Sequence, residues 1–155
     1  MQRAVVVAGF VGVVISGILT AAHVLDLPVP CGGAHDCATV AAHPSSRFAG
    51  VPVAAYGFVA YLAHVLLTGR PQVSRRDRVA ALVLAATGTL ISAGLLYYAH
   101  TVIRATCTWC VASGVTMTAL LLLDGLLLKN PAASVGSSRL WFWWLALFSA
   151  LVIGG

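Results

Sequence analysis

Apolar residues dominate five stretches of the chain, and the gaps between them collect proline, glycine and charged residues. The stretches cover approximately residues 4–25, 51–68, 79–100, 107–128 and 140–155. Within them, polar and apolar positions do not alternate as they would in membrane β-strands, and most approach the roughly 20 residues that a membrane-crossing helix needs. The pattern therefore predicts an all-α integral membrane protein with four helices in a bundle and a shorter fifth transmembrane helix.

Composition strengthens this prediction. Of the 155 residues, 60% are hydrophobic and only 8% are charged, and the mean hydropathy is +0.96, whereas about 25% of a soluble domain is charged. Such a chain has too little polar surface for a soluble globule and is too apolar for a disordered segment. We expect residues 1–128 to form the four-helix unit, with an outer loop at 26–50, and residues 129–155 to add a cytoplasmic loop and the fifth helix.

The distribution of basic residues predicts an orientation. The chain carries nine Lys and Arg against four Asp and Glu. If the N-terminus is cytoplasmic, only Arg47 and Arg104 face outward, while seven basic residues face the cytoplasm, namely Arg3, Arg70, Arg75, Arg76, Arg78, Lys129 and Arg139. The positive-inside rule favours this arrangement, which predicts a multi-pass protein of the plasma (inner) membrane with every cysteine on its outer face. A cleaved signal peptide at the first stretch is the alternative.

Two pairs of cysteines are the candidate chemistry. Cys107 and Cys110 form a CxxC at the predicted start of a helix, where free N–H groups, the helix dipole and nearby Arg104 favour a reactive thiolate. Cys31 and Cys37 lie in the outer loop, whose glycines let the pair swing between a soluble protein and the membrane-embedded pair. Thiol–disulfide exchange requires such a meeting.

Paired cysteines also have roles outside electron transfer. They can form purely structural disulfides, or a Cys₄ zinc site if both pairs meet. A small heavy-metal ion transporter that uses the pairs as ligands is the main alternative function, although a transporter needs ligands on both sides or at mid-depth. We expect no bound metal.

The remaining polar residues of the helices fit ordinary structural roles. Asp124 is expected to anchor the cytoplasmic end of its helix with Lys129 as a basic partner, and His64 is interpreted in the same way. His23 either relays protons or is an interfacial group at a helix end. Ser92 belongs to one of the small-residue faces that let helices approach closely.

The order of the cysteines resembles a known family. A loop pair comes first, a CxxC opens the fourth helix, and between them residues 48–57 read Phe-Ala-Gly-Val-Pro-Val-Ala-Ala-Tyr-Gly. This segment is similar to the Gly-(Ile/Val)-Pro start of the second helix in bacterial members of the vitamin K epoxide reductase family. The resemblance covers approximately residues 4–128, and the order and spacing of the cysteines are its specific part.

The resemblance implies a four-helix bundle that holds a quinone beneath the outer loop. It implies a membrane thiol:quinone oxidoreductase that supports disulfide bond formation, with electrons from a separate thioredoxin-like protein. Cys31 would meet that partner, Cys37 would form an interpair disulfide with Cys107, and Cys110 would face a quinone of the menaquinone or ubiquinone type. The catalytic residues are then Cys31, Cys37, Cys107 and Cys110.

Candidate quinone contacts follow from the same resemblance, with two departures. The expected contacts are Ser46, Phe48, Tyr56, Trp109 and Gly114. Bacterial members carry serines soon after the second loop cysteine, where this chain has Ala41-Ala42-His43 and places Ser45 and Ser46 later. Vertebrate members have a tyrosine where this chain has Gly114. We therefore expect quinone reduction more than epoxide reduction.

Overall fold

The computed structural model describes residues 1–28 and 36–130. Its α-helices are α1 (Gln2–Val24), α2 (Asp36–Ala42), α3 (Val53–Thr68), α4 (Arg75–Tyr98) and α5 (Thr108–Lys129). Between them lie a 3-10 turn, η1 (Pro44–Ser46), a pair of two-residue strands, β1 (Arg47–Phe48) and β2 (Val51–Pro52), and a π-helical turn, η2 (Ala99–Ile103). The predicted fifth transmembrane helix lies outside the described residues.

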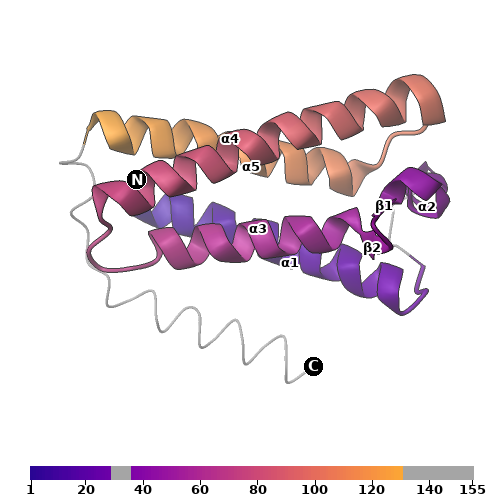
Figure 1. Ribbon diagram of the computed structural model, residues 1–155, viewed down its shortest axis with the longest axis horizontal. Coiled ribbons are helices and arrows are strands. Elements are labelled where there is room, and N and C mark those ends of the chain that lie inside the picture. The colour runs from indigo at the N-terminus through magenta and orange to yellow at the C-terminus, as the bar shows by residue number, and fades with distance from the viewer. Residues whose placement is uncertain (29–35, 131–155) are drawn as a thin grey trace.

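Helices α1, α3, α4 and α5 run side by side as a bundle (Figure 1). Helix α1 packs against α3 and α5, and α4 packs against the same two helices, so the four surround a common axis. The core between them contains Val5, Tyr61, Ala85, Met117 and Leu120. The predicted all-α membrane bundle is therefore confirmed.

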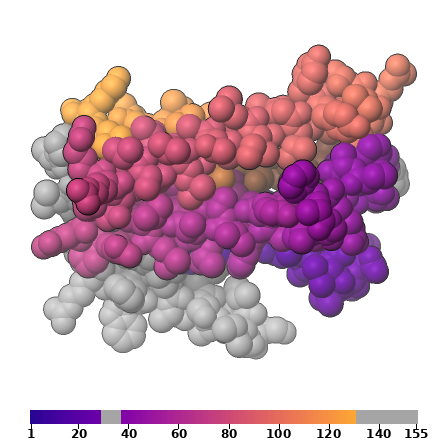
Figure 2. All heavy atoms as spheres, in the orientation of Figure 1, coloured from indigo at the N-terminus to yellow at the C-terminus, as the bar shows by residue number. Residues whose placement is uncertain are grey.

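The outward faces of the bundle are also apolar. Val7, Leu66, Leu90 and Leu122 are all more than 60% exposed, a distribution that suits lipid rather than water. Three helical segments, Gln2–Val24, Arg75–Ile103 and Thr108–Lys129, are long and apolar enough to cross a membrane, while Val53–Thr68 is apolar but shorter. Figure 2 shows one long face of the molecule, formed by α3 and α4.

Local sequence features explain why two helices begin where they do. The apolar pattern predicts a start near residue 79, but α4 begins at Arg75, because Ser74 and Asp77 form a capping box in which each side chain bonds the other's backbone N–H. Helix α3 begins at Val53, after Pro52. Ahead of it, β1 and β2 pair antiparallel through Ala49 and Gly50, which both have positive φ, as a two-residue hairpin turn requires.

Close helix contacts depend on small residues in α1. A methyl group built on Gly12 would overlap the Tyr61 ring, and one on Gly9 would press on Val65. Tyr61 has little freedom to move away, because its hydroxyl donates to the Ser113 carbonyl at 2.6 Å. Gly9 and Gly12 therefore let α1 and α3 approach closely.

The described part of the outer segment is more structured than the glycine-rich loop that the sequence predicts. Residues 36–52 form α2, η1 and the β1–β2 hairpin, which lie together at the end of the bundle where α4 turns into α5 (Figure 1). Cys37 lies inside α2 and is only 2% exposed. Cys37 therefore lies in a short buried helix in this oxidised structure and not in an irregular loop, because tertiary burial stabilises α2. The swing of the outer pair stays a prediction.

Candidate functional site

A cavity of about 240 Å³ lies between the bundle and the outer segment. Every helix of the bundle contributes to its walls, and α2 and η1 contribute from the outer side. Most of its lining is apolar, with Leu19, Ile91, Leu95 and Met117 among the larger side chains. Ligand pockets in proteins are typically roughly 300–1,000 Å³ and mostly apolar, with a few placed polar groups. The cavity thus approaches the size of a small-molecule site.

A disulfide forms one wall of this cavity. Cys107 and Cys110 are bonded to each other, with their Cα atoms 5.2 Å apart. Cys107 is the N-cap of α5, and its sulfur accepts a hydrogen bond from the Cys110 backbone N–H at 3.2 Å. Once the disulfide is reduced, this N–H and the helix dipole favour negative charge on the Cys107 sulfur. The CxxC therefore occupies the start of a helix, as its spacing predicts.

Cys37 borders the same cavity from α2, in the outer segment. Like Cys107, which is 4% exposed, it is buried, and it is also bound in a disulfide. Both residues line the cavity although they are far apart in the sequence. The fold thus brings one cysteine of the outer segment and the CxxC to a single enclosed space, while Cys31 lies outside the described residues.

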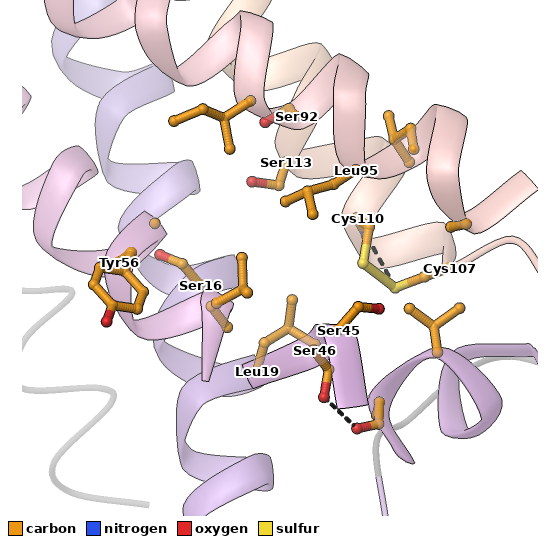
Figure 3. Close-up of a pocket in the computed structure, with 18 of the residues that line it drawn as sticks. Ser16, Leu19, Ser45, Ser46, Tyr56, Ser92, Leu95, Cys107, Cys110 and Ser113 are labelled. Carbon is orange, nitrogen blue, oxygen red and sulfur yellow. Dashed lines mark hydrogen bonds between the residues drawn. A yellow bond between two sulfur atoms is a disulfide. The ribbon is translucent and has the colours of Figure 1, made fainter. Parts of the chain in front are cut away.

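Serine hydroxyls are among the polar groups that line the cavity. Ser92 and Ser113 direct their hydroxyls into its open space from α4 and α5 (Figure 3). Ser16 and Ser46 also line it, but each donates its proton to a backbone carbonyl, that of Gly12 at 2.6 Å and that of Ala41 at 2.7 Å. Ser113 also lies 3.1 Å from the Tyr61 hydroxyl, whose own proton goes to the Ser113 carbonyl, so the Ser113 hydroxyl donates to Tyr61. Ser16, Ser46 and Ser113 therefore offer acceptor lone pairs to a ligand, whereas Ser92 offers its hydroxyl proton as well.

Of the five expected quinone contacts, two line the cavity and three do not. Ser46 and Tyr56 line the cavity. Phe48 is 71% exposed and packs edge-on against Tyr56 with ring centroids 6.1 Å apart, Trp109 is half-buried, and Gly114 packs against Leu96 and Ser92. These last three are not among the residues that line the cavity, and a contact between quinone and any of the five stays a prediction.

Several cavity residues have no clear signal in the sequence. Ser92 looks like a packing residue there, yet it faces the cavity. Tyr61 and Ser113 meet across α3 and α5, and His23 lines the cavity while one ring nitrogen bonds the Leu19 carbonyl at 2.9 Å. Ser92, Tyr61 and Ser113 become candidates only when helices distant in the sequence are placed together, whereas His23 is already a candidate proton relay in the sequence.

The sequence interpretation of Asp124 is wrong. Its side chain is buried and accepts a hydrogen bond from Nε2 of His64 at 2.7 Å, with the two side chains 4% and 0% exposed. The basic partner is therefore His64 on α3 and not Lys129. The reason is geometric, because the Asp124 side chain points into the bundle, where α3 presents His64.

The described residues contain no group of three or more His, Cys, Asp or Glu side chains arranged to hold a metal ion. For the transporter alternative, residues 1–28 and 36–130 thus offer no clustered ligand set. An apolar, hydroxyl-bearing cavity beside a disulfide suits an organic electron acceptor.

Comparison with known proteins agrees with this chemistry. No curated protein matches the chain. A family model described as "Vitamin K epoxide reductase family" matches residues 3–124, which is most of the chain. The chain therefore belongs to the vitamin K epoxide reductase family, whose members are membrane oxidoreductases that act on thiols or disulfides and on quinones.

Proposed function

We propose that this protein transfers electrons from the thiols of a separate thioredoxin-like protein to a quinone of the menaquinone or ubiquinone type. Electrons pass from the partner to Cys31 and Cys37, then to Cys107 and Cys110, and then to the quinone. The observation that carries the proposal is that Cys37 and the Cys107–Cys110 disulfide border one apolar cavity.

The exchange step follows from the chemistry of the two pairs. A thiolate on Cys37 attacks the Cys107 sulfur, a bond forms between these sulfurs, and Cys110 leaves as the thiolate. Cys31 then attacks Cys37, which re-forms the outer disulfide and leaves Cys107 and Cys110 reduced. Two electrons and two protons pass from these thiols when their disulfide closes again.

The cavity supports the role of the quinone as the final acceptor. When bound, a quinone supplies a pair of carbonyl oxygens that take up two electrons and two protons and become hydroxyls. Ser92 and Ser113 point hydroxyls into the space where such oxygens would lie (Figure 3), and apolar residues around them exclude water. A quinone held in this cavity would lie in the space that the Cys107–Cys110 disulfide borders.

The proposed site belongs at the outer membrane surface. The count of basic residues favours a cytoplasmic N-terminus, and the cavity lies at the opposite end of α1 from Gln2, near Leu19 and His23. This position gives a soluble extracytoplasmic partner access to the outer segment, while the quinone reaches the bundle through the lipid.

Replacing Cys31 by alanine distinguishes electron transfer from the protein partner from electron transfer to the quinone. Because a small dithiol reaches the cavity without help from Cys31, we expect Cys31→Ala to retain quinone reduction driven by dithiothreitol. Reduction driven by reduced thioredoxin should fall to background, since the thiolate of thioredoxin then has no Cys31–Cys37 disulfide to attack. Both rates are measured as the loss of oxidised quinone by purified full-length protein.

The wild-type protein with each reductant is the control for that experiment. A Cys31→Ala protein that accepts electrons from thioredoxin at the wild-type rate would contradict the assignment of Cys31. A wild-type protein that reduces no quinone with either reductant would contradict the proposed function as a whole.

A further inference from the structure

His43 and Ser45 form a bonded pair at the edge of the cavity. His43 is the N-cap of η1, and its Nδ1 lies 3.2 Å from the Ser45 backbone nitrogen and 2.8 Å from the Ser45 hydroxyl oxygen. A backbone N–H can only donate, so Nδ1 is the unprotonated nitrogen of the neutral ring. The Ser45 hydroxyl therefore also donates to Nδ1, and Nε2 carries the ring proton.

This arrangement turns the lone pairs of the Ser45 oxygen away from His43. Ser45 lines the cavity, and its hydroxyl points toward the Cys107 sulfur (Figure 3). A thiol at Cys107 thus shares the cavity with a hydroxyl whose own proton is already directed at an imidazole nitrogen. The order sulfur, hydroxyl and imidazole is that of a nucleophile served by a base through one intervening group.

The imidazole of His43 is held in place by neighbouring groups and is partly exposed to solvent. Its ring meets the edge of Tyr98 with centroids 6.1 Å apart, and Tyr98 itself lines the cavity. His43 is half-buried, so one side of the ring faces the Ser45 hydroxyl and the rest is not sealed within the protein. A fixed and partly accessible imidazole is suited to taking up and returning a proton.

We propose that Ser45 and His43 form a proton relay for Cys107, an inference that rests on the proposed function. As the reduced pair closes, the S–H bond of Cys107 breaks, its proton passes to the Ser45 oxygen, and the Ser45 proton passes to Nδ1 of His43. The S–S bond forms and the electron pair goes to the quinone. The Cys110 thiol supplies one proton of the quinol, and His43 returns the other through Ser45, so atoms and charge balance.

A proton relay requires residue 43 to take up a proton, whereas helix capping requires it only to accept a hydrogen bond. A cap needs only an acceptor at the position of Nδ1, and asparagine provides one and is among the best N-cap residues. Asparagine cannot hold the transferred proton. His43→Asn therefore keeps the cap of η1 and removes only the base.

The test is dithiothreitol-driven quinone reduction by the purified full-length protein. General acid–base catalysis contributes about 10²–10⁴-fold to rates, and we expect kcat of His43→Asn to fall by about 100-fold with an unchanged KM for quinone. The solvent deuterium isotope effect on kcat should rise, because proton transfer becomes limiting. Free imidazole should restore part of the rate of His43→Ala. A purely structural role would produce neither effect.

His100→Asn is the matched control, because His100 is an exposed histidine at the same end of the bundle that does not line the cavity. It should keep the wild-type kcat. A wild-type kcat in His43→Asn would overturn the relay while leaving the proposed function intact. Should His43→Asn fail to fold, a folded His43→Ala protein that imidazole does not accelerate would overturn it equally.

Discussion

Replacing Cys110 by alanine should lower dithiothreitol-driven quinone reduction to the rate measured without protein. Cys110 is bonded to Cys107 at the wall of the cavity, and without it no disulfide forms at the site proposed to exchange electrons with quinone. The remaining Cys107 thiol cannot deliver two electrons by closing a disulfide within the pair. The measurement is the loss of oxidised quinone over time.

Loss of folding does not account for that result. A disulfide that closes so short a loop stabilises a protein by about 2 kcal/mol in the chain-entropy account, so Cys110→Ala should remain folded. Val111→Ala is the matched control, since Val111 is the next residue of α5, is exposed and does not line the cavity. Quinone reduction at the wild-type rate by Cys110→Ala would contradict the proposed electron path.

Replacing Asp124 by alanine should lower the free energy of unfolding by about 3–5 kcal/mol, the range for breaking a buried polar pair on one side. The substitution leaves Nε2–H of His64 without its acceptor inside the bundle, where His64 is fully buried. The measurement is denaturant or thermal unfolding of the purified protein in detergent.

The double variant His64→Leu, Asp124→Leu distinguishes the free-energy cost of leaving one buried polar group unpaired from the net stabilisation that the His64–Asp124 pair provides. Replacing both polar groups by apolar ones removes the unpaired donor, and such replacements are often neutral or stabilising. We therefore expect the double variant to recover most of the stability lost by Asp124→Ala. Asp77→Ala, which loses the exposed hydrogen bonds that the Asp77 carboxylate accepts from the Ser74 backbone N–H and hydroxyl, should cost about 1 kcal/mol. An Asp124→Ala protein as stable as Asp77→Ala would contradict the buried pairing of His64 and Asp124.

The sequence predicts the bundle because each spanning helix is a continuous apolar run. The predicted first, third and fourth stretches lie within a few residues of α1, α4 and α5. The start of α4 differs because the capping box at Ser74 makes charged residues helical ahead of the apolar run. Hydrophobicity alone does not register such a cap.

The site is less predictable than the bundle. Spacing places Cys107 and Cys110 at a helix start because three residues of separation is a local property. The partner of Asp124 and the cavity-facing position of Ser92 depend instead on how helices distant in sequence are rotated against one another. Cys37 in α2 is a similar case, since a short helix of weak propensity is stabilised by tertiary burial.

The central claim is that electrons pass directly between Cys37 and Cys107. The double variant Cys31→Ala, Cys110→Ala leaves only these two of the four cysteines. After mild oxidation of the purified protein, peptide mapping by mass spectrometry without reducing agent should find them joined by a disulfide within one chain. Recovery of both as free thiols from folded, oxidised protein would contradict the claim.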